Sequence, residues 1–189
     1  GVLVRSEYRF SRLIETTDMD IRLVGDTLAM VALGHSTTLP VNIEEMIMHT
    51  CAVSRGCHNA LLVADMPFMS YQVSNEQAIT NAGRFIQEAG AQAVKLEGGT
   101  SMAKRVQALT AVDIPVMGHI GITPQSINRL GKYQVQGKTF MDARKIKQDA
   151  LSLQDAGVFS IVLEGIYDDV AAEITQDLKV PTIGIGAGV

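Results

Sequence analysis

Four apolar segments of the sequence end in a carboxylate residue. They read RLVGD at Asp26, LLVAD at Asp65, VKLEGG at Glu97 and IVLEG at Glu164. One such acid alone is commonly a helix N-cap or a first-turn residue, which needs no catalytic explanation. Four in succession favour a shared site, because the carboxyl ends of parallel strands in a barrel meet on one rim, where catalytic residues gather. We therefore expect the four acids to converge on one mouth.

The absence of histidine and thiol partners within these motifs bears on which cation the acids could hold. Carboxylates packed together raise one another's pKa unless a cation intervenes. Oxygen ligands alone favour Mg²⁺ over Zn²⁺, and Mg²⁺ usually takes one or two carboxylates with water and substrate oxygens. The pattern predicts two direct acid ligands, one acid acting through water, and a fourth acid free to act as a base.

Two further polar residues lie in predicted strands. Lys95 is two residues from Glu97 in AQAVKLEGGT, so both side chains should point to one face. Buried charges are rare unless they are paired or metal-bound. We expect Lys95 to bind a substrate carboxylate or a developing oxyanion, with a simple Lys95–Glu97 ion pair as the alternative. His119, in VMGHIGITPQS, is expected to donate a hydrogen bond to the substrate or to be structural.

A scaffold of alternating strands and helices is expected to position these residues. Such alternation predicts a parallel sheet, and strands that are apolar on both faces suit a buried one. The expected strands are 2–6, 21–26, 59–65, 93–98, 114–121, 159–164 and 182–186. Seven β/α units come close to the eight of a (β/α)₈ barrel, with a doubly wound open sheet as the alternative.

Helices are expected between these strands. The candidates are 43–53, 102–111, 169–178 and the stretches 74–90 and 139–157. Ser74 and Gln77 are spaced as in a capping box. Gly90 is placed as a helix-terminating glycine. The 139–157 stretch carries Ile146, Ala150 and Leu153 at the spacing of one helix face.

Composition narrows the functional classes. The chain has 189 residues, 47% of them hydrophobic, and a net charge of −4. It has no basic cluster with interleaved aromatics, no long apolar run and no secretory leader pattern, so we expect neither nucleic-acid binding nor a membrane span. Cys51 and Cys57 form no CxxC motif and are expected to be reduced thiols in a cytoplasmic protein, although an organellar form that has lost its targeting peptide would look the same. GIGAG near the end lacks the full dinucleotide-binding spacing.

Eight segments, in this order, together resemble the ketopantoate hydroxymethyltransferase family. They are LVGDTLAMVALGHSTTLPV, HTCAVSRG, LLVADMPFMSY, AVKLEGG, GHIGITPQS, YQVQGK, IVLEGI and PTIGIGAG. The resemblance implies a (β/α)₈ TIM barrel of the phosphoenolpyruvate/pyruvate superfamily. It implies transfer of a hydroxymethyl group from 5,10-methylenetetrahydrofolate to 3-methyl-2-oxobutanoate (2-oxoisovalerate). The product would be 2-dehydropantoate (ketopantoate), formed in the first step of pantothenate biosynthesis through a Mg²⁺-stabilised enolate. It also implies a homo-oligomer, commonly a decamer.

The resemblance also assigns roles to individual residues. Asp26 and Asp65 match metal-binding aspartates, and Glu97 matches a metal-site glutamate. Glu164 matches the catalytic base, and His119 matches an active-site histidine. The positions that match ketoacid contacts are Asp26, Thr27, Asp65 and Lys95.

The sequence departs from the family pattern at four places. ETTDMD stands where the family usually has a DEAGVD-like turn before the second strand. Thr27 stands where the family usually has serine, which keeps the hydroxyl. VLVRSEYRFSRL, with Arg5, Ser6 and Glu7, stands in the region of a TAYD-like motif at the end of the first strand. Nothing after GIGAG corresponds to the family's eighth strand and C-terminal helices. We therefore expect one barrel domain over residues 1–189 that is incomplete at its C-terminus.

Two other functions fit the same fold. One is a Mg²⁺-dependent lyase or mutase of 2-oxoacids in the same superfamily. Such lyases often carry a cysteine in a KKCGH-like loop, and KLEGG here counts against that reading. The other is a truncated, non-catalytic subunit, against which the complete set of acids and Lys95 argues.

Overall fold

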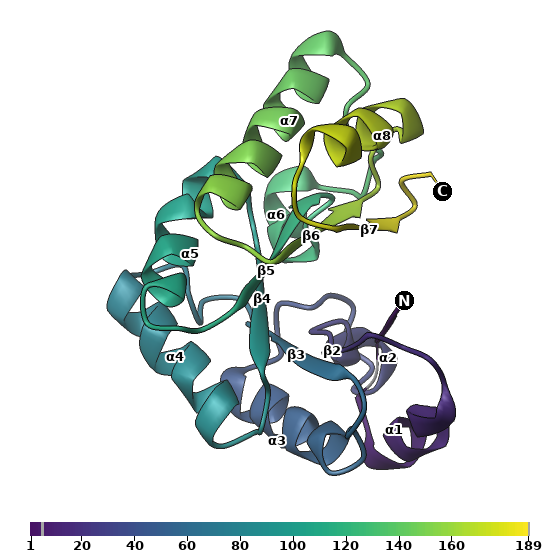
Figure 1. Cartoon of the computed structure of the whole chain (residues 1–189), viewed down its shortest axis with the longest axis vertical. Helices are drawn as coiled ribbons and strands as arrows, with labels where there is room; N and C mark the ends of the chain where they lie inside the picture. Colours follow the sequence, from purple (N-terminus) through teal and green to yellow (C-terminus); the bar gives the residue numbers. More distant parts are fainter. Residues whose placement is uncertain (5, 189) are drawn as a thin grey trace. The chain divides into compact units, whose positions relative to one another are not determined.

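The computed structural model describes residues 1–4 and 6–188 of the chain (Figure 1). Within this part, parallel strands alternate with helices along the chain. The strands are β1 Val2–Val4, β2 Ile21–Val24, β3 Leu61–Asp65, β4 Ala93–Glu97, β5 Val116–Gly121, β6 Ser160–Glu164 and β7 Thr182–Ile185. All seven predicted strands are confirmed, each shorter than predicted by one or two residues. Arg5, within the first predicted strand, lies outside the described residues.

The predicted helices are also present. They are α3 Ile43–Ser54, α4 Asn75–Gln87, α5 Ala103–Thr110, α7 Phe140–Asp155 and α8 Asp168–Asp177. Three short helices were not predicted: α1 Tyr8–Leu13, α2 Leu28–Val31 and α6 Ile127–Leu130. Single 3₁₀ turns are η1 Ile14–Thr16, η2 Thr100–Met102 and η3 Pro124–Ser126. Helices of four to six residues hold too few positions for a periodic pattern to stand out.

Helix caps differ in part from the expected ones. Ser74 is the N-cap of α4, and its side chain accepts a hydrogen bond from the Gln77 backbone N–H. The Gln77 side chain bonds the backbone of Val73 and Met69, so the capping box predicted here is incomplete. A complete capping box lies at the N-terminus of α3, where the side chains of Asn42 and Glu45 each accept a hydrogen bond from the other's backbone N–H.

Residue contacts group into two units, Gly1–Lys95 (unit 1) and Leu96–Val189 (unit 2), with the boundary inside β4. Unit 1 holds β1, β2, β3 and the first part of β4, hydrogen-bonded side by side in that order. Helix α3 packs on β2, β3 and α4 (Figure 1). In the register of β3 and β4, Asp65 lies opposite Lys95.

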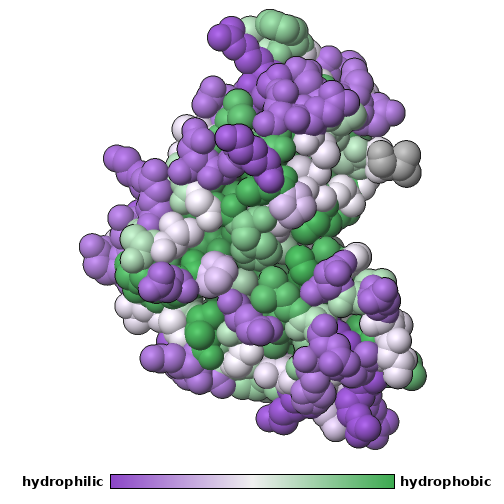
Figure 2. Space-filling model, viewed as in Figure 1, coloured by the Kyte–Doolittle hydropathy of each residue, from purple (hydrophilic) through white to green (hydrophobic). Residues whose placement is uncertain are grey.

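Unit 2 continues the same pattern with the end of β4 followed by β5, β6 and β7. Helix α7 packs on β5, β6 and α8, and buries Ile146, Ala150 and Leu153 as predicted. Hydrophilic side chains gather over α7 and α8 (Figure 2). Parallel strands that neighbour one another in chain order and alternate with helices are the arrangement of a (β/α)₈ barrel, here with seven strands described. The single-domain prediction remains a prediction.

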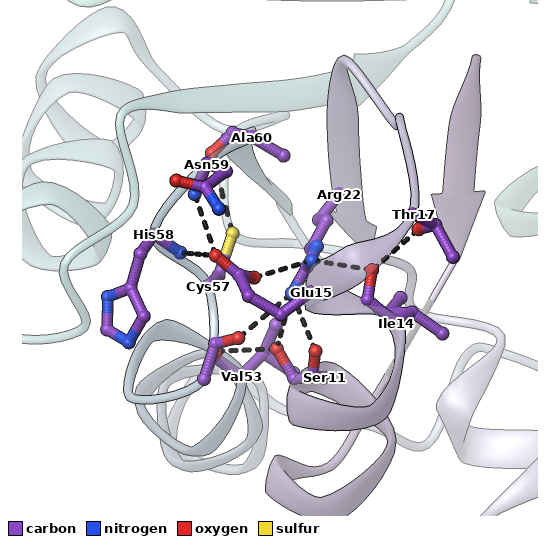
Figure 3. A network of polar contacts seen from close by, with 11 residues as sticks. Ser11, Ile14, Glu15, Thr17, Arg22, Val53, Cys57, His58, Asn59 and Ala60 are labelled. Carbon is purple, nitrogen blue, oxygen red and sulfur yellow. Dashed lines mark hydrogen bonds and ion pairs between the residues drawn. The ribbon is translucent and has the colours of Figure 1, made fainter.

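A buried arginine on β2 binds carbonyl groups at the C-terminal ends of α1 and α3 (Figure 3). Arg22 on β2 is 1% exposed. Its guanidinium donates hydrogen bonds to the carbonyl oxygens of Ser11 and Ile14 at the end of α1, and to that of Gly56 after α3. It also pairs with Glu15 at 2.6 Å. Since helix C-termini leave carbonyl groups unsatisfied, one cation on β2 stabilises the ends of two helices.

Two expectations from composition can be compared with the structure. None of the described helices has the length and apolar character needed to cross a bilayer. Cys51 and Cys57 are both free thiols, in agreement with the predicted reduced state.

Candidate active site

The first cluster of predicted site residues lies in unit 1, at the carboxyl ends of β2 and β3 and in the middle of β4. Lys95 Nζ lies 2.5 Å from Asp65 Oδ1. The backbone N–H of Asp26 donates to Asp65 Oδ2 over 3.1 Å. Asp65 ends β3, whereas Asp26 lies two residues beyond the end of β2. The Asp65 carboxylate is thus held between a cation on one side and a loop N–H on the other.

Burial makes the charged forms of these side chains unfavourable. Asp26 and Asp65 are each 2% exposed, and Lys95 is 4% exposed. Burial raises the pKa of Asp65 to about 7, with the neighbouring Asp26 also raising it and the charge of Lys95 opposing the shift. One ammonium group cannot balance two ionised carboxylates, so the ionised cluster carries a net charge of −1. A bound cation would relieve this imbalance.

The second cluster lies in unit 2 and centres on His119 of β5. His119 Nδ1 lies 3.7 Å from Glu97 Oε1, and its Nε2 lies 3.3 Å from Glu164 Oε2. His119 is 2% exposed and Glu97 is 6% exposed. The imidazole therefore lies between two carboxylates that end β4 and β6, close enough to both for ion pairing when the ring is protonated.

A backbone group holds Glu97 in place. The N–H of Gln125, in the turn η3 after β5, donates to Glu97 Oε2 over 3.1 Å. The sequence reading assigned Gln125 no role, although GITPQS was one of the segments that carried the family resemblance. The available signal is Pro124, because proline is favoured at the first position of a helical turn and Pro124 begins η3.

Exposure separates the two glutamates of this cluster. The Glu164 side chain is 26% exposed, whereas that of Glu97 is 3% exposed. A general base must reach the proton that it removes. The geometry therefore suits Glu164 for removing a proton from a ligand. It suits Glu97 for an anchored role, either structural or facing a metal ion.

The glycines after Glu97 meet protein rather than open space. A Cβ on Gly99 would collide with the Asp149 side chain of α7, whose carboxylate accepts a hydrogen bond from the Thr100 N–H. Gly98 has a φ of +121°. These two glycines thus allow a turn that packs closely on α7.

The donor set of unit 1 fits a hard divalent cation. Asp26 and Asp65 supply two carboxylates, the number that Mg²⁺ usually takes from protein. Among residues 1–4 and 6–188, no group of three or more His, Cys, Asp or Glu side chains is arranged to hold a metal ion. The remaining ligands would therefore be water and substrate oxygens.

The structure thus gathers the predicted site residues into two sets. Unit 1 brings together Asp26, Asp65 and Lys95, and Thr27 follows Asp26 as the N-cap of α2. Unit 2 brings together Glu97, His119 and Glu164. Convergence of the four acids on one mouth stays a prediction.

Solved structures with the same fold are enzymes with low sequence identity. A phosphonopyruvate hydrolase in complex with oxalate and Mg²⁺ superposes with a TM-score of 0.72 at 12% identity, over 97% of this chain and 65% of the hydrolase. A phosphoenolpyruvate phosphomutase from Streptomyces platensis gives the same TM-score and identity, over 97% of this chain and 67% of the mutase. These likenesses confirm the (β/α) barrel fold. The chain spans just under two thirds of the hydrolase.

Similarity in sequence is much closer to one family. A 3-methyl-2-oxobutanoate hydroxymethyltransferase of Pelobacter propionicus is 58% identical over 182 residues, which are 96% of this chain and 67% of the relative. That of Syntrophotalea carbinolica is 53% identical over all of this chain and 71% of the relative. The sequence profile of the ketopantoate hydroxymethyltransferase family matches residues 2–189. The chain therefore belongs to the ketopantoate hydroxymethyltransferase family.

Proposed function

We propose that this protein transfers a hydroxymethyl group from 5,10-methylenetetrahydrofolate to 3-methyl-2-oxobutanoate, giving 2-dehydropantoate for pantothenate biosynthesis. The observation that carries the proposal is the burial of charged side chains at strand ends, Asp26, Asp65, Lys95 and Glu97, in a chain of this family. A fold stabilised by its core alone does not need buried charges there. A small anionic substrate and a cation account for them.

The residues of unit 1 would bind the ketoacid. Lys95 offers a buried ammonium group to an anionic substrate, and the hydroxyl of Thr27 offers a hydrogen bond beside Asp26. The proposal assigns Asp26 and Asp65 as metal ligands, with Glu97 as the further metal-site acid. Mg²⁺, when bound, would supply Lewis-acid polarisation of the keto group.

The residues of unit 2 would move the proton. Glu164 removes a proton from the carbon beside the ketone, and the His119 ring lies beside the Glu164 carboxylate, with Nε2 at 3.3 Å from Oε2. The resulting carbanionic carbon forms the new C–C bond to the one-carbon unit of the folate. Water supplies the hydroxyl oxygen, and tetrahydrofolate leaves.

The test is proton NMR of 3-methyl-2-oxobutanoate in deuterated buffer with Mg²⁺, with and without methylenetetrahydrofolate. We expect exchange of the C–H beside the ketone in both samples and 2-dehydropantoate only with the folate. Exchange without any product formation would point to another 2-oxoacid reaction. Absence of both C–H exchange and product formation would contradict the proposal and favour a non-catalytic role.

A further inference from the structure

A cavity of about 420 Å³ lies in unit 1 beside the carboxyl ends of β1 and β2. Its walls come from the end of β1, from α1 and from α2. The wall residues that matter here are Val4, Ser6, Glu7, Phe10, Thr27 and Val31. Cavities of roughly 300–1,000 Å³ are typical of small-molecule sites, and a five-carbon acid fills only part of such a volume.

The cavity adjoins the acid cluster of unit 1. Gly25 lines it, and a Cβ on Gly25 would lie 3.7 Å from Asp65 Oδ2 and 3.1 Å from Thr27 Oγ1. A ligand bound by Thr27 and Lys95 would therefore lie next to this cavity. Gly25 thus lies at the part of the cavity wall that faces Asp65 and Thr27.

The cavity wall is part polar, with Ser6, Glu7 and Thr27, and part apolar, and its apolar residues include exposed ones. Val4 is 42% exposed, Phe10 is 51% exposed and Val31 is 81% exposed. Apolar side chains grouped around one hollow are a feature of ligand-binding grooves. Glu7 adds a negative charge at the same wall, which disfavours a second carboxylate on the ligand.

Two features of this chain create and hold the cavity. Ser6, whose side chain is small, lines the cavity and fills little of its space. The wall formed by α1 is fixed by the hydrogen bonds from Arg22 to Ser11 and Ile14 (Figure 3). One wall of the space is thus formed by a helix that is anchored to the sheet.

We propose that this cavity receives the alkyl branch of the 2-oxoacid and admits branches one or two carbons longer than that of 3-methyl-2-oxobutanoate. The inference rests on the proposed function and specifies its substrate range. Monocarboxylic 2-oxoacids with aliphatic branches fit the apolar part of the wall at Val4, Phe10 and Val31, whereas dicarboxylic ones meet Glu7. A methylene group in an apolar pocket changes kcat/KM by roughly 10- to 200-fold, so the choice is measurable.

The experiment compares C–H exchange of 3-methyl-2-oxobutanoate, 4-methyl-2-oxopentanoate and 2-oxoglutarate in deuterated buffer with Mg²⁺. The wild type should exchange the two monocarboxylic acids with kcat/KM values within about tenfold of each other, and 2-oxoglutarate at least roughly tenfold more slowly. Ser6→Tyr, which fills the cavity, should lower the ratio of long-acid to short-acid kcat/KM by roughly tenfold or more. Val31→Trp narrows the cavity from α2 at an exposed position and should lower the same ratio.

Met48→Tyr is the matched control, because Met48 is 59% exposed on α3 and does not line the cavity. Its ratio should equal that of the wild type. Exchange of the short acid alone, or an unchanged ratio in both folded cavity variants, would overturn the inference while leaving the proposed function intact. Exchange of no 2-oxoacid would overturn the proposed function and the inference with it.

Discussion

Lys95 Nζ lies 2.5 Å from Asp65 Oδ1, and the two residues are direct partners in the register of β4 and β3. Both are almost completely buried. A buried ion pair is weak evidence for stability, because removing two charges from water can outweigh their attraction. The pair, together with the second carboxylate of Asp26, is therefore better explained by the binding of a charged ligand than by folding.

Replacing Lys95 with Met tests how strongly the cluster depends on this cation. Lys95→Met leaves Asp26 and Asp65 buried without the ammonium group, so the free energy of unfolding should fall by about 3–5 kcal/mol. Urea unfolding in the presence of a chelator measures it. Lys104→Met, at an exposed position of α5, should change stability by at most about 0.5 kcal/mol. Equal losses in the two variants would contradict the role given to Lys95.

Replacing Glu164 with Gln tests the proposed base. The amide cannot accept a proton, so exchange of the C–H of 3-methyl-2-oxobutanoate should fall by roughly 100-fold or more. Ketoacid binding, measured by calorimetry, should persist. Glu173→Gln removes an exposed carboxylate on α8 that pairs with Lys147 and should leave exchange unchanged. Undiminished exchange in Glu164→Gln would exclude this residue as the base.

Replacing Arg22 with Met tests how much its bonds to the ends of α1 and α3 stabilise the fold. The change leaves Glu15 without its cation and several carbonyl groups without a donor, so unfolding free energy should fall by about 3–5 kcal/mol. Adding Glu15→Gln removes the uncompensated charge and should recover part of that loss. Urea unfolding of the two single variants and the double variant gives the coupling energy. Strict additivity would show that the ion pair contributes nothing.

The pH dependence of stability should report the same ion pair. Burial raises the pKa of Glu15, but the N–H groups of His58 and Asn59 and the charge of Arg22 outweigh it, so the pKa lies below the ordinary 4.5. A lowered folded-state pKa contributes stability above the unfolded value, and that stability is lost as pH falls through the folded value. The stability difference between wild type and Glu15→Gln should therefore be largest near neutral pH and shrink below pH 4.5. A difference that stays constant down the acid range would contradict this.

Two glycines offer a matched test of the backbone beside Glu164. Gly121 has a φ of +94°, and a Cβ there would collide with the Glu164 carbonyl oxygen. Gly131 has a φ of +71° and open space around it. Gly131→Ala should cost only the backbone strain of about 1–2 kcal/mol. Gly121→Ala should cost clearly more in thermal unfolding and should slow C–H exchange, because it displaces Glu164. Equal costs would show that the close approach is unimportant.

Local pattern was sufficient for the elements and for the types of site residue. Apolar segments between polar loops predicted every strand to within two residues, because strand and helix periodicities are local properties. The acid at the end of a segment was visible in the same way at Asp65, Glu97 and Glu164, each the last residue of its strand. The short helices α1, α2 and α6 were missed because they depend on contacts rather than on period.

Which side chains meet was decided by the tertiary structure. The spacing of Lys95 and Glu97 indicated a shared face, but the register of β3 and β4 is what sets Lys95 against Asp65. Likewise, Arg22 reads as a charge in an apolar strand until α1 and α3 bring their carbonyl groups to it. Sequence by itself determined which residues can carry charge or accept a proton, since those are properties of each side chain. Burial and pairing decided what they do, because they arise only when strands far apart in sequence lie side by side.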